Sequence, residues 1–298
     1  MTDAQIPTPE VGPWAKEKLD ALERYLDYYT KRLKNQTHWR KIYLDAFAGG
    51  GRAKVRRRPT LASSQNSLWD EEPPPPEVNE FVSGSPRRAL ELANPFDSYI
   101  FIDANPARIS MLEQLKKEYG DRRRITLRKG EADNEVGWVL SFKPTKAHHR
   151  GVAFLDPFGA HLSWSTVLDL AKTEVFEVIV NFPLHMCLNR LMTRNPDEIR
   201  ATWRAQLDSF LPPGWYDQAY ETVRGILGEE VSKRSDASDR LLTWYREQLR
   251  NAFGFVSEPR LIRNTQGGPL YYLLWAGPNE AGLSGANHIM RMGEVSSI

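Results

Sequence analysis

Cysteine is almost missing from this sequence of 298 residues, in which Cys187 stands alone. A disulfide within the chain is therefore excluded, and so is a metal site built from several cysteines. No apolar run approaches the roughly 20 residues that cross a bilayer. The N-terminus also lacks the basic start and apolar core of a secretory signal. These absences predict a cytoplasmic protein without a membrane segment.

An excess of one charge is missing as well, because 40 Lys and Arg face 38 Asp and Glu, which gives a net charge of +2. A role in nucleic-acid binding would therefore depend on a local patch. One candidate holds five cations in seven residues: Arg52, Lys54, Arg56, Arg57 and Arg58. Such a cluster can neutralise phosphates. The alternative is a solvated loop that balances the acidic residues 70–72.

Helical and strand patterns alternate through the first two thirds of the chain. Strands are expected at 42–45, 98–103, 124–127, 151–156 and 175–182, and helices at 14–33, 85–92, 106–119, 134–142 and 163–171. This rhythm favours a parallel sheet covered on both faces. A hairpin at 260–264 and 270–276 and a helix at 281–292 would close the fold. The pattern predicts an α/β protein with the Rossmann-like class I methyltransferase fold, mainly parallel, with a C-terminal antiparallel hairpin and a helical insertion.

The same patterns divide the chain into four parts. Residues 1–40 are expected to form a loose arm, over 1–12, and a helix, and residues 41–184 the Rossmann-like core. Within the core, 52–83 is expected to be an exposed insertion, because its four prolines at 73–76 cannot continue a helix. Residues 185–254 are predicted to be a helical cap, and residues 255–298 the closing hairpin and last helix of the core.

A glycine-rich turn follows the first predicted strand, in Asp45-Ala-Phe-Ala-Gly-Gly-Gly51. A cofactor at the carboxyl ends of parallel strands needs close backbone approach there, and glycine allows it. We therefore expect Asp45, Phe47, Gly49 and Gly51 to bind a cofactor; a tight turn without a ligand is the alternative. The Gly-x-Gly-x-x-Gly fingerprint of NAD-binding proteins is absent. The turn thus favours S-adenosylmethionine.

Carboxylates follow the next two predicted strands. Asp103 ends the second strand, where an acidic side chain can accept hydrogen bonds from both ribose hydroxyls. Asp133 follows the third strand, where side chains of this fold class meet the adenine amino group. Either residue could instead cap the helix that follows it.

The fourth predicted strand ends in Asp156-Pro157-Phe158-Gly159. A carboxylate and backbone carbonyls there can orient an amine, and an aromatic ring can stack on an exposed base. We therefore expect Asp156, Pro157 and Phe158 to be catalytic, with a structural turn as the alternative. The pair His148-His149 is a poor metal site, because the two residues lack helical spacing and have no cysteine ligand nearby. No metal is therefore predicted.

Two resemblances arise from these motifs. Asp45-Ala-Phe-Ala-Gly-Gly-Gly51 with Asp156-Pro-Phe-Gly159 resembles the paired motifs of amino-methyltransferases that act on DNA or RNA. Over roughly residues 14–292 the sequence resembles the three-Cys-motif partner protein family. The matching segments are Trp14 with Glu17-Lys-Leu19, Tyr43-Leu-Asp-Ala-Phe-Ala-Gly49, Gly84-Ser-Pro86, Phe101-Ile-Asp103, Gly151-Val-Ala-Phe-Leu-Asp-Pro157, Trp164-Ser-Thr166, Asn189-Arg-Leu191 and Pro269-Leu-Tyr-Tyr272. This resemblance implies a methyltransferase-like fold and a companion protein with three cysteines, of radical-SAM type.

The leading hypothesis is methyl transfer from S-adenosylmethionine to a nitrogen or oxygen nucleophile, which Asp156 would orient or deprotonate. Alignment and exclusion of water can supply several kcal/mol of the barrier. The rival hypothesis is a non-catalytic adaptor or nucleic-acid-binding partner that keeps the fold. Turnover would separate the two.

Overall fold

The computed structural model describes residues 10–12, 14–55, 81–225 and 228–296. Within that part of the chain, the largest sheet has nine strands in the order β14-β12-β13-β8-β7-β2-β5-β6, and β11 also pairs with β13. The strands are β2 (Arg40–Asp45), β5 (Ser98–Asp103), β6 (Ile125–Lys129), β7 (His149–Leu155), β8 (Phe176–Phe182), β11 (Phe255–Val256), β12 (Arg260–Arg263), β13 (Pro269–Gly277) and β14 (Glu294–Val295).

Strand direction divides this sheet in two. β6, β5, β2, β7 and β8 are parallel neighbours, whereas β13 runs antiparallel to both β8 and β12. The five parallel strands match the predicted ones to within two residues at each end. The observed order confirms the expected Rossmann-like class I methyltransferase fold with its antiparallel hairpin.

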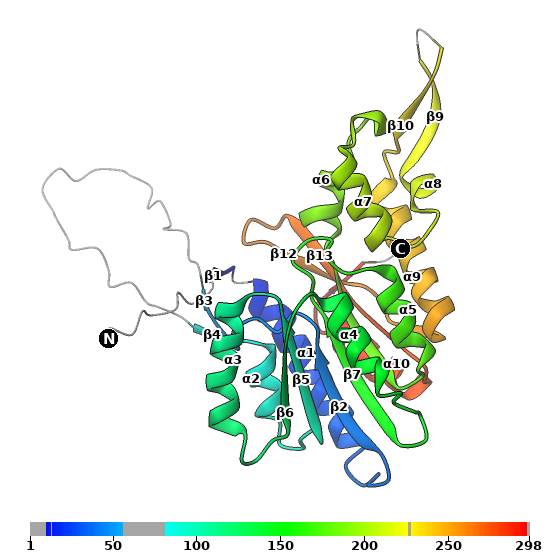
Figure 1. The fold of residues 1–298 in the computed structure, drawn as a ribbon. Coiled ribbons are helices and arrows are strands. Elements are labelled where there is room, and N and C mark those ends of the chain that lie inside the picture. The colour runs from blue at the N-terminus through cyan, green and yellow to red at the C-terminus, as the bar shows by residue number, and fades with distance from the viewer. Residues whose placement is uncertain (1–9, 13, 56–80, 226–227, 297–298) are drawn as a thin grey trace, which may run out of the picture.

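Helices cover both faces of the sheet (Figure 1). One apolar core gathers α1 (Trp14–Arg32), α2 (Ser85–Leu90), α3 (Pro106–Tyr119) and α10 (Glu280–Met290) on one face. The other core gathers α4 (Ala132–Ser141), α5 (Trp164–Lys172) and the cap helices on the opposite face. In α1 the apolar residues that recur every three or four positions are buried, including Leu19, Leu22 and Leu26. Helical spacing of apolar residues thus decided how this helix packs.

The cap between β8 and β11 is not wholly helical, which corrects the prediction for residues 185–254. It contains η1 (Leu184–Leu188), α6 (Asn189–Leu191), η2 (Pro196–Glu198), α7 (Ala201–Phe210), α8 (Trp215–Ala219) and α9 (Ala237–Phe253). It also contains an antiparallel pair, β9 (Tyr220–Gly225) and β10 (Gly228–Lys233), which projects away from the sheet (Figure 1). Gly228 has a φ of +130°, so the chain reverses where glycine is needed. Thr222, Val223 and Val231 favour the extended backbone.

A small sheet corrects two further expectations. β1 (Glu10–Val11), β3 (Arg52–Val55) and β4 (Phe81–Ser83) pair in the order β1-β3-β4. The end of the expected loose arm and both ends of the expected exposed insertion are therefore strands. The rest of that insertion, with Arg56, Arg57, Arg58 and the proline run, lies outside the described residues. By pairing Arg52 with Ser83, the sheet returns the chain to α2 beside the glycine turn.

Over the described ranges, no helix combines the length and the apolar character needed to cross a membrane.

Candidate functional site

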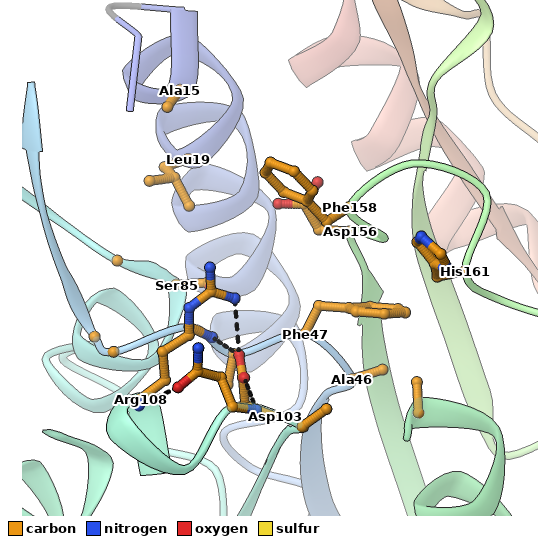
Figure 2. A pocket seen from close by; sticks show the side chains of 18 of the residues that line it. Ala15, Leu19, Ala46, Phe47, Ser85, Asp103, Arg108, Asp156, Phe158 and His161 are labelled. Carbon is orange, nitrogen blue, oxygen red and sulfur yellow. Dashed lines mark hydrogen bonds and ion pairs between the residues drawn. The ribbon is translucent and has the colours of Figure 1, made fainter. Parts of the chain in front are cut away.

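A cavity of about 450 Å³ opens where β2, β5, β6 and β7 end, and α1 forms one of its walls (Figure 2). Pockets for small molecules commonly have this size. The carboxyl ends of parallel strands supply most of its lining, in residues 46–52, 103–105 and 130–132, and in Asp156, Phe158 and His161. Ala15, Lys18, Leu19, Val82, Gly84, Ser85 and Arg108 complete it. The structure thus brings all four predicted strand ends together around one cavity.

The glycine turn forms the floor of the cavity. Gly49 has a φ of +63°, which L side chains rarely adopt, and a Cβ there would meet no atom within 4 Å. Gly49 lines the cavity, so a side chain at this position would take up part of that open space. Gly51, with a φ of +72°, and Gly50 pack close to Leu115 and Met111 of α3. Gly49 therefore leaves space in the cavity, whereas the lack of a side chain at Gly50 and Gly51 lets the turn pack closely against α3.

Asp103 locks the turn to the end of β5. Its Oδ2 accepts a hydrogen bond from the Gly49 amide at 3.0 Å, and its Oδ1 accepts one from the Asn105 amide at 2.8 Å. Arg108 reaches Oδ2 at 3.5 Å (Figure 2). The side chain is only 6% exposed but lines the cavity. Asn105, and not Asp103, caps α3 by accepting from the Ala107 amide at 2.8 Å. The carboxylate therefore keeps lone pairs for a ligand.

Asp45 lies behind the cavity rather than in its wall, which corrects its predicted contact with the cofactor. It is fully buried, and its carboxyl accepts from the Phe47 amide and the Tyr43 hydroxyl, each at 3.3 Å. Burial raises the pKa of Asp45 to about 7, against the lowering effect of hydrogen bonds from Ser85 and Phe47, and the charge of Asp156 adds to the rise. Asp45 supports the turn from below, while Phe47 itself lines the cavity.

Asp133 also faces away from the cavity. Its Oδ1 accepts hydrogen bonds from the Ser163 amide at 3.1 Å and from the Thr166 hydroxyl at 2.6 Å. Asp133 therefore fastens the start of α5 to the start of α4. The cavity is lined at this strand end by Gly130, Glu131 and Ala132 instead. The segment was placed correctly, but the residue within it was not.

Asp156 lies at the opposite end of the cavity, where side chains from distant elements hold its carboxylate in place. Lys18 of α1 places Nζ 2.5 Å from Oδ2, and Asn181 of β8 donates from Nδ2 to Oδ1 at 2.7 Å. The Lys18 side chain is 12% exposed, and its ammonium lies 5.3 Å from the centre of the Tyr271 ring. Burial raises the pKa of Tyr271 well above its usual range, and the charge of Asp156 contributes. This end is a charged pair sheltered by an aromatic ring.

Phe158 is 78% exposed although it lines the cavity, whereas Pro157 is buried and does not line it. Phe47, Asp156, Phe158 and His161 project toward one side of the cavity (Figure 2). An exposed aromatic ring beside a carboxylate provides a flat apolar face next to a hydrogen-bond acceptor. Of the three residues predicted to be catalytic, Asp156 and Phe158 therefore line the cavity, and Pro157 belongs to the turn between them.

Of the predicted basic cluster, Arg52 is exposed and lines the cavity. Lys54 belongs to β3, and its backbone pairs with Phe81. The remaining three arginines lie outside the described residues. Within the described ranges, no group of three or more His, Cys, Asp or Glu could hold a metal ion.

Lys18 is the main cavity residue that the sequence analysis missed. It lies between Ala15 and Leu22 on the stripe of α1 that turns toward the sheet, where its neighbours are buried. A single lysine inside an apolar stripe is a detectable signal, because burial of a charge requires a partner. The partner, Asp156, is 138 residues away.

Comparison with known proteins supports the fold. No protein-family model matches the chain, and no curated protein matches it significantly. A Legionella pneumophila protein of the family DUF519 superimposes with a TM-score of 0.51 at 13% identity, over 94% of this chain and 90% of that one. At that identity the likeness shows a shared fold only.

Two weaker structural likenesses carry no argument of their own. One is to the N-terminal domain of EvdMO1, solved with S-adenosylhomocysteine and D-fucose (TM-score 0.37, 9% identity, 85% of this chain and 83% of that one). The other is to an Escherichia coli protein assigned provisionally as a methyltransferase (TM-score 0.31, 12% identity, 86% and 87%). The methyltransferase-like fold of this chain rests on its own strand order.

Proposed function

We propose that this protein is an S-adenosylmethionine-dependent methyltransferase. The observation that carries the proposal is one cavity with two unlike ends at the carboxyl edge of the parallel strands. Gly49 and Asp103 lie at one end and Asp156 at the other. Ligands of open parallel sheets bind along this edge.

The residues of the first end fit the cofactor. The open side of Gly49 accommodates the methionine portion, and the Asp103 carboxylate accepts hydrogen bonds from the ribose hydroxyls. Glu131, which is exposed and lines the cavity, takes the place first assigned to Asp133 beside the adenine. When bound, S-adenosylmethionine supplies an electrophilic methyl group on a sulfonium sulfur.

The second end would align the acceptor. Each carboxylate oxygen of Asp156 keeps a lone pair beyond those used by Lys18 and Asn181, so it can accept a hydrogen bond from an N–H of the acceptor. As the acceptor nitrogen gains the methyl group, the same carboxylate can take its proton, and the Lys18 ammonium offsets the carboxylate charge before that transfer. The exposed ring of Phe158 favours a planar amine, such as a nucleic-acid base, as the acceptor.

A companion protein with three cysteines is part of the same proposal. It comes from the motif resemblance to the three-Cys-motif partner family, whose segments include the cavity residues of the glycine turn and Asp156. Co-purification of this chain with such a companion, expressed together, would test it.

Thermal unfolding with S-adenosylmethionine, S-adenosylhomocysteine and NAD tests the cofactor. Each sulfur cofactor at about 100 times its Kd should stabilise the protein by roughly 2.7 kcal/mol, and NAD should not. Stabilisation by NAD alone would overturn the proposal.

Asp156→Ala tests the chemistry. Transfer of tritiated methyl to nucleic acid should fall by about 1,000-fold, which is in the range that general-base and positioning groups supply, while the Kd for S-adenosylmethionine by calorimetry stays within about threefold. Equal loss of binding and turnover would move Asp156 into the cofactor end. If the protein binds S-adenosylmethionine but methylates no acceptor, even with the companion protein present, the non-catalytic adaptor hypothesis would be favoured.

A further inference from the structure

A cation-rich surface lies at the opposite end of the sheet, where the parallel strands begin. The loop after α1 that leads into β2 lies at the far end of the strands from the small β1-β3-β4 sheet (Figure 1). β2 has six residues, so this edge is about 20 Å from the cavity. We call it the amino-edge face and define it by residues 33–41, 120–125 and 142–150.

Cations are concentrated on the amino-edge face. These three segments hold nine Lys or Arg residues and a single carboxylate, Asp121. The nine are Lys34, Arg40, Lys41, Arg122, Arg123, Arg124, Lys143, Lys146 and Arg150. Two further carboxylates adjoin them: Asp97, which accepts from the Lys41 amide, and Glu174, which pairs with Lys146. Nine cations against three carboxylates are a strong local excess in a chain whose net charge is only +2.

Sheet pairing fixes these segments side by side. The Arg40 amide donates to the His148 carbonyl, the Asp97 amide to the Lys41 carbonyl, and the Tyr99 amide to the Arg124 carbonyl. The starts of β6, β5, β2 and β7 therefore form a row, with neighbouring strands about 4.8 Å apart. A recess of about 340 Å³ lies within it, lined in part by Lys34, Trp39 and Lys41. The cations of the three segments therefore lie along one row of strand starts, and the recess lies within this row.

Aromatic rings accompany the cations. Phe142 is 67% exposed, one of the most exposed large apolar side chains in the described ranges, and it contacts Trp138 edge-on with ring centres 4.6 Å apart. The Arg150 guanidinium lies 3.9 Å from the centre of the Trp39 ring, and the exposed His38 ring lies 4.3 Å from Trp39 on centres. Flat rings between cations are the combination that binds single-stranded nucleic acid, because phosphates need charge and bases need stacking surfaces.

The backbone that presents Phe142 is strained. Lys143 follows it with a φ of +49°, a left-handed conformation that costs a non-glycine residue roughly 1 kcal/mol or more. Glycine would occupy this position after α4 without that cost. The sequence instead holds a lysine at the position, next to an exposed phenylalanine. Strain retained at a surface is typical of a binding segment.

We propose that the amino-edge face binds single-stranded nucleic acid, with Arg40, Arg124 and Lys143 on its phosphates and Phe142 stacked on a base. This inference is independent of the proposed methyl transfer, because it concerns the other edge of the sheet. An acidic protein would match the same charge, and the comparison with polyglutamate separates the two partners.

Fluorescence anisotropy with a labelled 12-nucleotide oligouridylate tests the proposal. With about five phosphates neutralised, the affinity of the full chain should fall by roughly 100-fold between 50 and 200 mM salt. Arg124→Glu with Lys143→Glu should weaken binding at least tenfold and flatten the salt dependence. The matched pair Arg224→Glu with Arg250→Glu, exposed on the cap, should change the Kd by less than threefold.

Phe142→Ala, which keeps every charge, should weaken binding about tenfold through lost stacking. S-adenosylhomocysteine at saturation should not compete, since its cavity lies at the other edge. Absence of binding at 50 mM salt, or equal loss in both charge-reversal pairs, would overturn the proposal. If polyglutamate of equal charge binds as tightly as the oligonucleotide, and Phe142→Ala does not weaken that binding, the partner of this face would be an acidic protein rather than nucleic acid.

Discussion

The two ends of the cavity are built in opposite ways. At the end proposed for the cofactor, Gly49 and Asp103 lie at the carboxyl ends of two neighbouring strands, β2 and β5, and the Gly49 amide donates a hydrogen bond to the Asp103 carboxylate. At the acceptor end, Asp156 is held by side chains from α1 and β8, which lie far from it in sequence. The first end is a property of local turns, whereas the second exists only once the whole domain has packed. Mutations at the two ends should therefore differ in their effects on stability and on ligand binding.

The pH dependence of Asp45 should give the largest effect, at the cofactor end. Its folded pKa of about 7 lies above the unfolded value near 3.9, so the folded state binds a proton more tightly. This contribution to stability is complete below pH 4 and is lost as pH rises to about 7. Between pH 4 and pH 8 the loss is roughly 4 kcal/mol. Urea unfolding of the wild type and Asp45→Asn should show it as a difference that grows over this range and then levels off. A constant difference would contradict the raised pKa.

Gly49→Val should weaken S-adenosylmethionine binding about 100-fold. A β-branched residue at a φ of +63° adopts a disfavoured conformation, and its side chain occupies the ligand cradle. Calorimetry gives the Kd. Gly137→Ala is the control, because Gly137 lies in α4 with open space around its Cβ position and should gain a fraction of 1 kcal/mol in stability without a change in Kd. A Gly49→Val protein that binds normally would remove the glycine turn from the site.

Lys18→Met should have the smallest effect, confined to the acceptor end. It leaves Asp156 partly buried with one hydrogen-bonding side chain, which costs about 1–2 kcal/mol of stability. Lys31→Met is the matched control in the same helix: the Lys31–Asp27 pair is largely exposed and should cost less than about 0.5 kcal/mol. Denaturant unfolding measures both. Equal effects would show that the Lys18–Asp156 pair contributes no more than a surface pair.

The contrast also explains what the sequence could reveal. The parallel strands were predictable because each is a short apolar run. Gly49, Asp103 and Asp156, which line the cavity, could be singled out because each lies at or just after the carboxyl end of its strand. Asp133 was misplaced because a carboxylate at a helix start can point to a ligand or to a neighbouring helix, and only packing decides that it holds Ser163. Pattern alone could locate each strand end but not the direction of each side chain.

Long-range pairing sets the remaining limit. The Lys18–Asp156 contact joins residues 138 positions apart, and no local pattern specifies it. The pair β9 and β10 was hidden because the cap around it is rich in helical spacing, and its six-residue strands are short. The amino-edge face was visible only as scattered Arg and His runs until the sheet order placed them in one row.

The position of β13 governs when this sheet can be completed during synthesis. β13 pairs with β8, yet the two strands are separated by the whole cap, so β8 leaves the ribosome about 90 residues before its partner. At typical elongation rates of 5–20 residues per second, its outer edge stays unpaired for roughly 5–20 s. An apolar strand with a free edge is prone to pair with other chains. The nascent protein is therefore most vulnerable to aggregation, and most in need of a chaperone, while its cap is being made.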